Sequence, residues 1–154
     1  DPNQMERLRH TKPVSEAQAL DYAAVYLPGG HGTMWDFPDN EALQELIRKV
    51  YEQGGALASV CHGAAAFVNV QLSGGDYLVD GKSVNSFTNE EEEQVELHTV
   101  VPFLLEDALK EKGANFEHSG KFSEHLTIDE RLITGQNPAS VKAVADALLE
   151  LLQD

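Results

Sequence analysis

The sequence predicts an α/β protein whose parallel sheet is covered by helices on both faces. Residues 23–27 and 56–60 are short apolar runs flanked by glycine, as expected of buried strands, and each is followed by a segment with helical features. Strands and helices that alternate in this way favour a parallel sheet buried on both sides. The 154 residues, 42% of them hydrophobic, suffice for one such fold, so we expect residues 1–154 to form a single domain.

Periodicity and capping residues predict the other elements of the first half. Residues 3–20 are polar, with short helical patches on either side of Pro13. Asp39 or Asn40 can cap a helix that ends at Gly54. Its apolar residues recur at i, i+3, i+4 and i+7, namely Leu43, Leu46, Ile47 and Val50.

Turn and cap signals divide the remainder of the chain. We expect the small-residue segment 63–70 to be helical, and Asp80-Gly81 predicts a hairpin between residues 77–79 and 83–87. Asn89 is then predicted to cap an acidic helical stretch. The last third is predicted to contain an amphipathic helix over 101–112, a short strand over 115–118, a hairpin of 126–128 with 132–134, and a helix over 141–152 that follows Asn137-Pro138.

Composition and charge exclude several classes of function. The chain has 26 Asp and Glu against 11 Lys and Arg, a formal net charge of −15, so we expect no nucleic-acid partner. The longest mostly apolar stretch, residues 56–70, is interrupted by His62 and falls short of the roughly 18–20 residues that span a bilayer, so we expect no membrane role. A single cysteine cannot form an intramolecular disulfide, and we therefore expect a cytoplasmic location.

That single cysteine, Cys61, lies where a nucleophile elbow is expected. It joins a strand to a helix, with the small residues Ser59 and Gly63 two positions to either side, where a sharp turn brings backbones together. Ligands bind at the carboxyl ends of parallel strands, and a helix N-terminus favours the thiolate. The alternative is a buried cysteine that acts only as a small hydrophobic residue. The context favours the reactive thiol, with His62 either its base or a polar residue at a helix start.

Other candidate groups are weaker on their own. The glycines of residues 28–32 follow the first strand and either present backbone N–H groups as an oxyanion hole or form an ordinary turn. Glu92 falls at position N3 of a helix capped by Asn89, which favours a capping box or a solvated acidic turn. Trp35 is a candidate for either a pocket wall or the core. Four histidines lack the spacing of metal ligands, so we expect no metal site from His10, His98, His118 and His125.

Five ordered motifs resemble the PfpI superfamily and, within it, the glutathione-independent glyoxalases of the heat-shock chaperone type. They are LPGGHGTMWD (27–36), ASVCHG (58–63), SFTNEEE (86–92), VPFLLED (101–107) and LITGQNP (132–138). The match runs from about Tyr22 to the C-terminus. The resemblance implies a class I glutamine-amidotransferase-like fold, which is a flavodoxin-like three-layer sandwich with a mainly parallel sheet.

The resemblance also implies a catalytic set. In the family this set is a cysteine, the histidine after it and a glutamate of the phenylalanine-threonine segment, which here are Cys61, His62 and Glu92. Glu91 is the second choice for the acid, because the acidic run permits a slip of one residue. The implied oxyanion and substrate-binding positions are Gly29, Gly30 and His31, together with the amide of His62. No cofactor and no metal are implied.

The implied reaction converts methylglyoxal, a small reactive dicarbonyl, and water to lactate without glutathione, as a D-lactate dehydratase does. The Cys61 thiolate adds to the aldehyde, and His62, oriented by Glu92, moves a proton between the two carbons. Three alternatives remain open. The first is another enzyme on the same elbow, namely a cysteine hydrolase, an amidase or a protein deglycase. The second is a holdase chaperone without catalysis, and the third is an inactive remnant.

One departure from the family concerns the start of the chain. Relatives begin with a strand, a helix and a second strand, and a glutamate from that unit hydrogen-bonds the cysteine. This sequence lacks the unit, so we expect a further segment of roughly 60–80 residues in the natural protein, in the same chain or as a companion chain. We also expect a homodimer, because homodimers are common among relatives.

Overall fold

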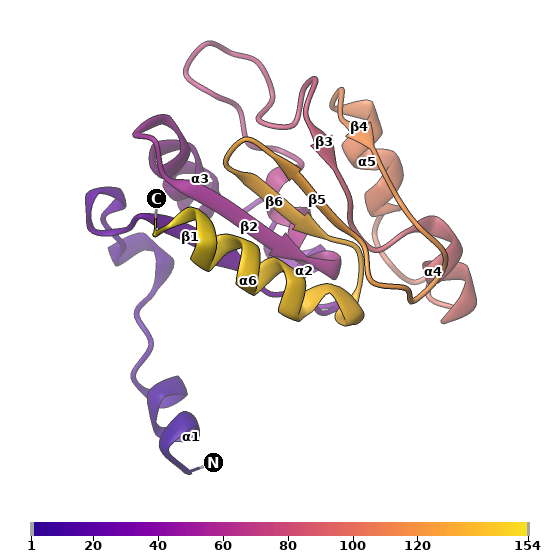
Figure 1. Cartoon of the computed structure of the whole chain (residues 1–154), viewed down its shortest axis with the longest axis horizontal. Coiled ribbons are helices and arrows are strands. Elements are labelled where there is room, and N and C mark those ends of the chain that lie inside the picture. Colours follow the sequence, from indigo (N-terminus) through magenta and orange to yellow (C-terminus); the bar gives the residue numbers. More distant parts are fainter. Residues whose placement is uncertain (1, 154) are drawn as a thin grey trace.

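A four-stranded sheet lies at the centre of the computed structural model, which describes residues 2–153. The strand order is β1-β2-β6-β5, where β1, β2 and β6 run parallel and β5 is antiparallel to β6 (Figure 1). The strands span Ala24–Leu27 (β1), Ala56–Val60 (β2), Leu126–Asp129 (β5) and Leu132–Gly135 (β6). The predicted α/β class, the mainly parallel sheet and the hairpin near the C-terminus are therefore confirmed.

Helices cover both faces of this sheet and complete three layers (Figure 1). On one face, α3 (Glu41–Glu52) buries Leu43, Ile47 and Val50 of its predicted apolar stripe, and Leu46 is half-buried. The side chain of Asn40 caps the helix by accepting the N–H of Leu43. On the other face lies α6 (Val141–Leu151). Side chains of β2 alternate between the two cores, as the pleat requires. Leu57 packs with Ile47 and Val50 of α3, whereas Ala56 and Ala58 pack with Val144 and Leu148 of α6.

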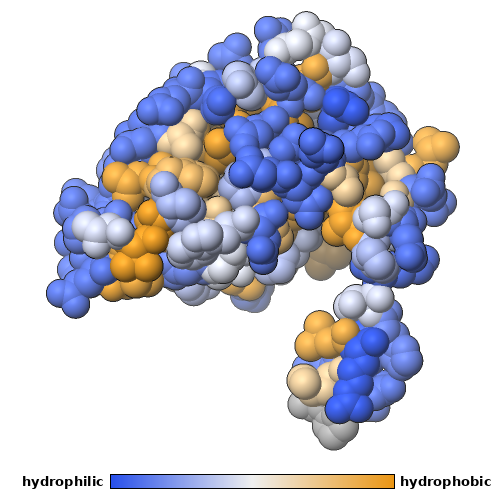
Figure 2. Space-filling model, turned by 180° about the vertical axis from the view of Figure 1, so that it is seen from behind, coloured by the Kyte–Doolittle hydropathy of each residue, from blue (hydrophilic) through white to orange (hydrophobic). Residues whose placement is uncertain are grey.

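The N-terminal residues form short helical elements. They are α1 (Pro2–Arg9) and the 3-10 turns η1 (Val14–Glu16) and η2 (Ala19–Asp21), in agreement with helical patches on either side of Pro13. Helix α1 lies apart from the sheet (Figure 1), and the view from behind in Figure 2 shows a small lobe that stands away from the rest of the molecule. Figure 2 also shows hydrophobic residues gathered in separate patches on that side of the molecule.

Short elements connect the sheet to its surroundings. They are α2 (Thr33–Asp36), η3 (Cys61–Phe67), β3 (Ser83–Val84), α4 (Asn89–Gln94), α5 (Leu105–Glu111), β4 (Asn115–Phe116) and η4 (Pro138–Ser140). The helix expected over 63–70 is the 3-10 helix η3, and the amphipathic helix expected over 101–112 begins only at Leu105. Within residues 2–153, every helix is too short or too polar to span a bilayer.

The hairpin predicted around Asp80-Gly81 is wrong. A turn does form, with Gly81 at a φ of 71°, but the segments on its two sides do not pair with each other. Tyr77 bridges Gln71 in antiparallel fashion, and β3 pairs in parallel with β4. The backbone N–H of Gly81 donates to the carbonyl of Gly113. Residues 77–79 and 83–87 therefore use other partners, a nearby one for Tyr77 and the distant strand β4 for β3.

Candidate active site

Cys61 occupies a strained turn at the carboxyl end of β2, where η3 begins. Its φ of 59° places a non-glycine residue in the left-handed region, an arrangement typical of a nucleophile elbow. Gly63 is required two residues later, because a Cβ at that position would collide with the carbonyl group of Leu27. Ser59, two residues before the cysteine, is fully buried. The predicted small residues therefore lie where the turn needs them.

The glycine loop after β1 packs directly against this elbow. A Cβ on Gly29 would lie 2.6 Å from the carbonyl oxygen of Val60, so only glycine permits the approach. The hydroxyl of Thr33 lies 2.8 Å from the carbonyl oxygen of Gly30 and 2.9 Å from that of His62, and it can donate to either. The loop and the elbow thus open on the same edge of the sheet, as predicted.

The structure brings the three predicted catalytic side chains into one hydrogen-bonded series. Sγ of Cys61 lies 3.3 Å from Nδ1 of His62, and Nε2 of His62 lies 2.7 Å from Oε2 of Glu92. The side chain of His62 is fully buried, and that of Glu92 is 5% exposed. A carboxylate only accepts hydrogen bonds, so Nε2 of a neutral His62 carries the proton and Nδ1 presents a lone pair to the thiol. The arrangement can therefore remove a proton from Cys61.

The two neighbouring glutamates have different environments, and the expected cap is off by one residue. Thr88, not Asn89, caps α4, and Glu91 occupies N3 of the capping box. The N–H of Thr88 donates to Oε2 of Glu91 over 2.9 Å, and the side chain of Asn137 donates to Oε1 over 2.8 Å. Glu91 is thus held by structural hydrogen bonds. Glu92, one position further on, is the acid that contacts His62.

Burial sets the protonation of the cysteine and histidine. It raises the pKa of the Cys61 thiol to about 11, and the charges of Glu91 and Glu92 act in the same direction, while hydrogen bonds from the backbone of His62 and Gly30 oppose it. Burial also lowers the pKa of His62, against the hydrogen bond with Glu92. Desolvation of the charged sulfur thus opposes the thiolate that a helix N-terminus would favour. Both shifts favour the neutral thiol and the neutral imidazole.

A cavity of about 640 Å³ opens over the cysteine. Sequence reasoning identified the wall that contains Gly29, Gly30, His31, Cys61 and His62. It did not identify the largely apolar remainder, which is formed by Tyr26, Pro28, Val60, Phe87, Val95, Phe122, Pro138 and Val141. These residues come from distant segments, and among them only Pro28, Val60, Phe87 and Pro138 belong to the motifs noted in the sequence. Trp35 is 54% exposed and does not line the cavity.

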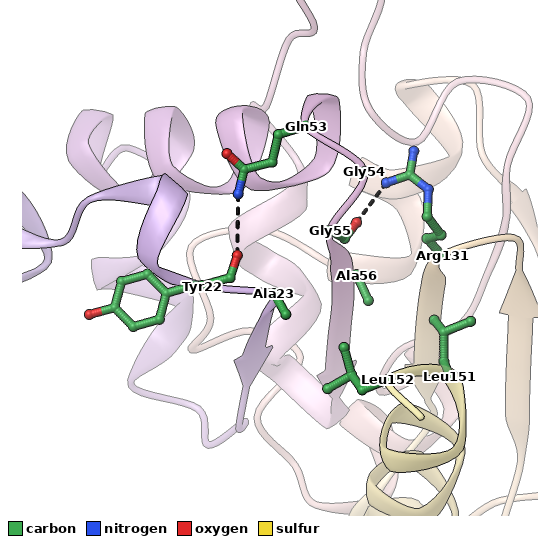
Figure 3. Close-up of a pocket in the computed structure, with 9 residues that line it drawn as sticks. All are labelled: Tyr22, Ala23, Gln53, Gly54, Gly55, Ala56, Arg131, Leu151 and Leu152. Atoms are coloured by element: carbon green, nitrogen blue, oxygen red, sulfur yellow. Dashed lines mark hydrogen bonds between the residues drawn. The ribbon is translucent and has the colours of Figure 1, made fainter. Parts of the chain in front are cut away.

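A second hollow lies at the amino ends of β1 and β2 (Figure 3). Its lining includes Tyr22, Leu151 and Leu152, together with Arg131. The guanidinium of Arg131 donates to the carbonyl oxygens of Tyr51 and Gly55, the second of which Figure 3 shows. This arginine therefore ties together backbone segments, and the hollow is remote from the cysteine.

One group of side chains has the composition of a metal site. Nitrogens of His31 and His62 and a carboxylate oxygen of Glu92 lie within 4.8 Å of one another, and this donor set suits Zn²⁺. The same atoms are already paired by hydrogen bonds of 2.7 Å. An ion could bind only by displacing those bonds, and it would then occupy the nitrogen that holds His62 against its acid.

The fold and the site define an α/β protein with a cysteine nucleophile elbow and an adjacent histidine-glutamate pair. The chain matches the DJ-1/PfpI family over residues 4–151, and it belongs to that family.

Individual relatives place the chain more closely. It is 33% identical over 150 residues to the probable glutathione-independent glyoxalase hsp3104 of Schizosaccharomyces pombe, covering 94% of this chain and 68% of that protein. It is 32% identical to the glutathione-independent glyoxalase HSP31 of Saccharomyces cerevisiae, covering 96% of this chain and 65% of that protein.

Solved structures of similar proteins superpose on the chain. Rapid Encystment Protein 24 kDa of Francisella tularensis superposes with a TM-score of 0.93 at 35% identity, covering 97% of this chain and 67% of that one. Glyoxalase III of Candida albicans superposes with a TM-score of 0.88 at 29% identity, covering 93% and 62%. The chain therefore spans about two thirds of the length of these relatives.

Proposed function

We propose that this protein is a cysteine-dependent lyase, a glutathione-independent glyoxalase that converts methylglyoxal and water to lactate. The observation that carries the proposal is the series of hydrogen bonds from Cys61 through His62 to Glu92, which opens into a largely apolar cavity. The names of the relatives in two yeasts, and of the Candida albicans structure, support the same activity. No cofactor enters the reaction.

The first step joins the sulfur to the aldehyde carbon of methylglyoxal. As the C–S bond forms, the thiol proton passes to Nδ1 of His62, so the high pKa of Cys61 is overcome by transfer during the attack. The aldehyde oxygen becomes an oxyanion beside the sulfur. The backbone N–H groups of Gly30 and His62, which hydrogen-bond the Cys61 sulfur in the structure, are near enough to bind it. It then takes the proton from His62 and gives a thiohemiacetal.

The second step moves a proton between adjacent carbons. Nδ1 of His62 removes the proton from the former aldehyde carbon, and the ketone oxygen gains a proton, which yields an enediol. A proton then returns from His62 to the neighbouring carbon while the former aldehyde oxygen loses its hydroxyl proton, which replaces the one taken up by the ketone oxygen. The product is a lactoyl thioester on Cys61. Water attacks the thioester carbonyl, the C–S bond breaks, and the sulfur recovers its proton. The sum is one methylglyoxal and one water for one lactic acid, so no external oxidant or reductant is needed.

The test is methylglyoxal consumption by the purified protein without glutathione, with lactate measured by enantiomer-specific dehydrogenases. We expect lactate to appear in equal amount to the methylglyoxal consumed, and Cys61→Ala to abolish both. Full consumption by Cys61→Ala would refute the mechanism, because the chain contains no second thiol.

Parallel assays on the same samples separate the alternatives. Hydrolysis of amides without lactate formation indicates a cysteine hydrolase or amidase, and release of methylglyoxal from glycated peptides indicates a deglycase. Suppression of aggregation that survives Cys61→Ala indicates a holdase. Three exposed apolar residues at the mouth of the cavity, Val95, Phe122 and Val141, are a surface such an activity could use.

We further propose that the protein is a cytoplasmic homodimer. In this proposal, a strand from a preceding or companion segment covers the free edge of β1. The support is that β1 is an outer strand of the sheet described here and that the relatives are longer than this chain. An uncovered parallel edge presents unpaired backbone groups. Intact mass spectrometry and light scattering of the active protein test this, and a folded, active protein of 16.9 kDa without a companion polypeptide would contradict it.

A further inference from the structure

The carboxyl group of Glu92 lies between two imidazoles. Oε2 is 2.7 Å from Nε2 of His62, and Oε1 is 2.7 Å from Nε2 of His31. The two rings lie 4.0 Å apart between centroids. Over residues 2–153, these histidines are the side-chain hydrogen-bond partners of the Glu92 carboxyl group. Each oxygen of this buried acid therefore depends on one imidazole.

His31 reaches Glu92 from a different part of the fold. It belongs to the glycine loop after β1, 61 residues before Glu92 in the sequence, and its side chain is 33% exposed and lines the cavity. The loop is itself fastened to the elbow through Thr33. The His31 ring is thus anchored on the same body as the cysteine.

The hydrogen bonds determine which nitrogens carry protons. Because the Glu92 carboxylate accepts from both rings, Nε2 of His31 and Nε2 of His62 must both donate. His62 then has its lone pair on Nδ1, facing Cys61. The opposite tautomer of His62 would set a lone pair against the carboxylate and an N–H against the thiol. Base function at Cys61 therefore requires that Glu92 keep its present orientation.

We propose that His31 is a positioning residue that keeps Glu92 in this orientation. By donating from Nε2 to Oε1, it prevents rotation of the carboxyl group and so holds His62 in the tautomer that accepts the Cys61 proton. This role is separate from oxyanion binding, which uses backbone N–H groups of the same loop. The inference rests on the proposed function only in taking His62 as the base.

Two variants separate the hydrogen bond from the ring. His31→Phe keeps an aromatic ring but has no donor, so we expect kcat for methylglyoxal to fall roughly ten- to hundredfold, with less effect on KM. His31→Gln has an amide N–H near the position of Nε2 and should recover most of the loss. Nitrogen-15 NMR of the imidazoles should show His62 protonated on Nε2 in the wild type and a mixture of tautomers in His31→Phe.

The outcomes are decisive in both directions. Wild-type His31 protonated on Nδ1 alone, wild-type kcat in His31→Phe, or equal damage in His31→Gln would each overturn the proposal. The wild-type spectrum does not depend on whether a variant folds. If the wild type consumes no methylglyoxal, the proposed function fails. The role of His31 can still be decided from the NMR tautomers and from the rate at which iodoacetamide alkylates Cys61, which we expect to be slower in His31→Phe.

Discussion

Replacing Glu91 with Gln should lower the free energy of unfolding by about 2–4 kcal/mol, whereas the same change at Glu92 should chiefly remove activity. The Glu91 carboxyl group accepts five hydrogen bonds. Its Oε1 accepts from the backbone N–H of Phe122 and from the side-chain amides of Gln136 and Asn137, and its Oε2 accepts from the N–H and hydroxyl of Thr88. These bonds join α4 to two other segments.

The magnitude follows from this arrangement. A glutamine side chain keeps one acceptor oxygen and turns its NH₂ group toward the remaining donors, so at least one buried N–H loses its acceptor. An unsatisfied buried donor costs about 1–3 kcal/mol, and loss of the charge weakens the retained bonds by about 1 kcal/mol more. The sum is a large part of the roughly 5–15 kcal/mol that stabilises a typical domain.

Urea unfolding followed by circular dichroism measures the free energy of unfolding of Glu91→Gln, Glu92→Gln and the control Glu93→Gln. Glu93 is exposed on the same helix, so its change should stay within about 0.5 kcal/mol. Glu92→Gln affects two hydrogen bonds and should cost only about 1–2 kcal/mol, while kcat for methylglyoxal falls roughly a hundredfold or more. Wild-type stability of Glu91→Gln, or wild-type activity of Glu92→Gln, would refute the assignment.

Two further predictions concern the elbow. Burial raises the pKa of Cys61 from 9.0 to about 11, so the unfolded chain loses the thiol proton at a lower pH than the folded chain does. The shift therefore contributes about 2–3 kcal/mol to the free energy of unfolding below about pH 9, and this contribution is lost as the pH rises through 11. The difference in unfolding free energy between wild type and Cys61→Ala should shrink by that amount from pH 8 to 11, and a pH-independent difference would contradict the described burial. Gly63→Ala should lower the free energy of unfolding by more than about 3 kcal/mol, because its Cβ would collide with Leu27. The control Gly74→Ala has open space around its Cβ and should be neutral. Thermal melting compares the two, and equal melting temperatures would rule out the close approach at Gly63.

The elements that sequence reasoning predicted well are those encoded by neighbouring residues. The strand over 56–60 has the predicted bounds, and Asn40 caps the helix whose stripe repeats at helical spacing. The hairpin around Gly81 failed because a turn signal is local, whereas the pairing of β3 depends on Asn115–Phe116. Local chemistry can specify a turn without specifying which strands meet there.

The cap of α4 illustrates the limit of local rules. Thr88 and Asn89 are both good N-caps, and each places a glutamate at N3, Glu91 for the first and Glu92 for the second. A rule based on spacing cannot choose between them. Tertiary contacts choose, because Asn137 and Phe122 donate to Glu91 and leave Glu92 facing His62.

The elbow can be predicted from local sequence, because a strand, a cysteine and the small residues Ser59 and Gly63 are adjacent along the chain. The environment of the thiol, in contrast, depends on contacts made by folding. The bond between His31 and Glu92 joins residues 61 positions apart, and the high pKa of Cys61 comes from burial under distant segments. Hydrogen bonding and desolvation depend on distances in space, and packing sets those distances.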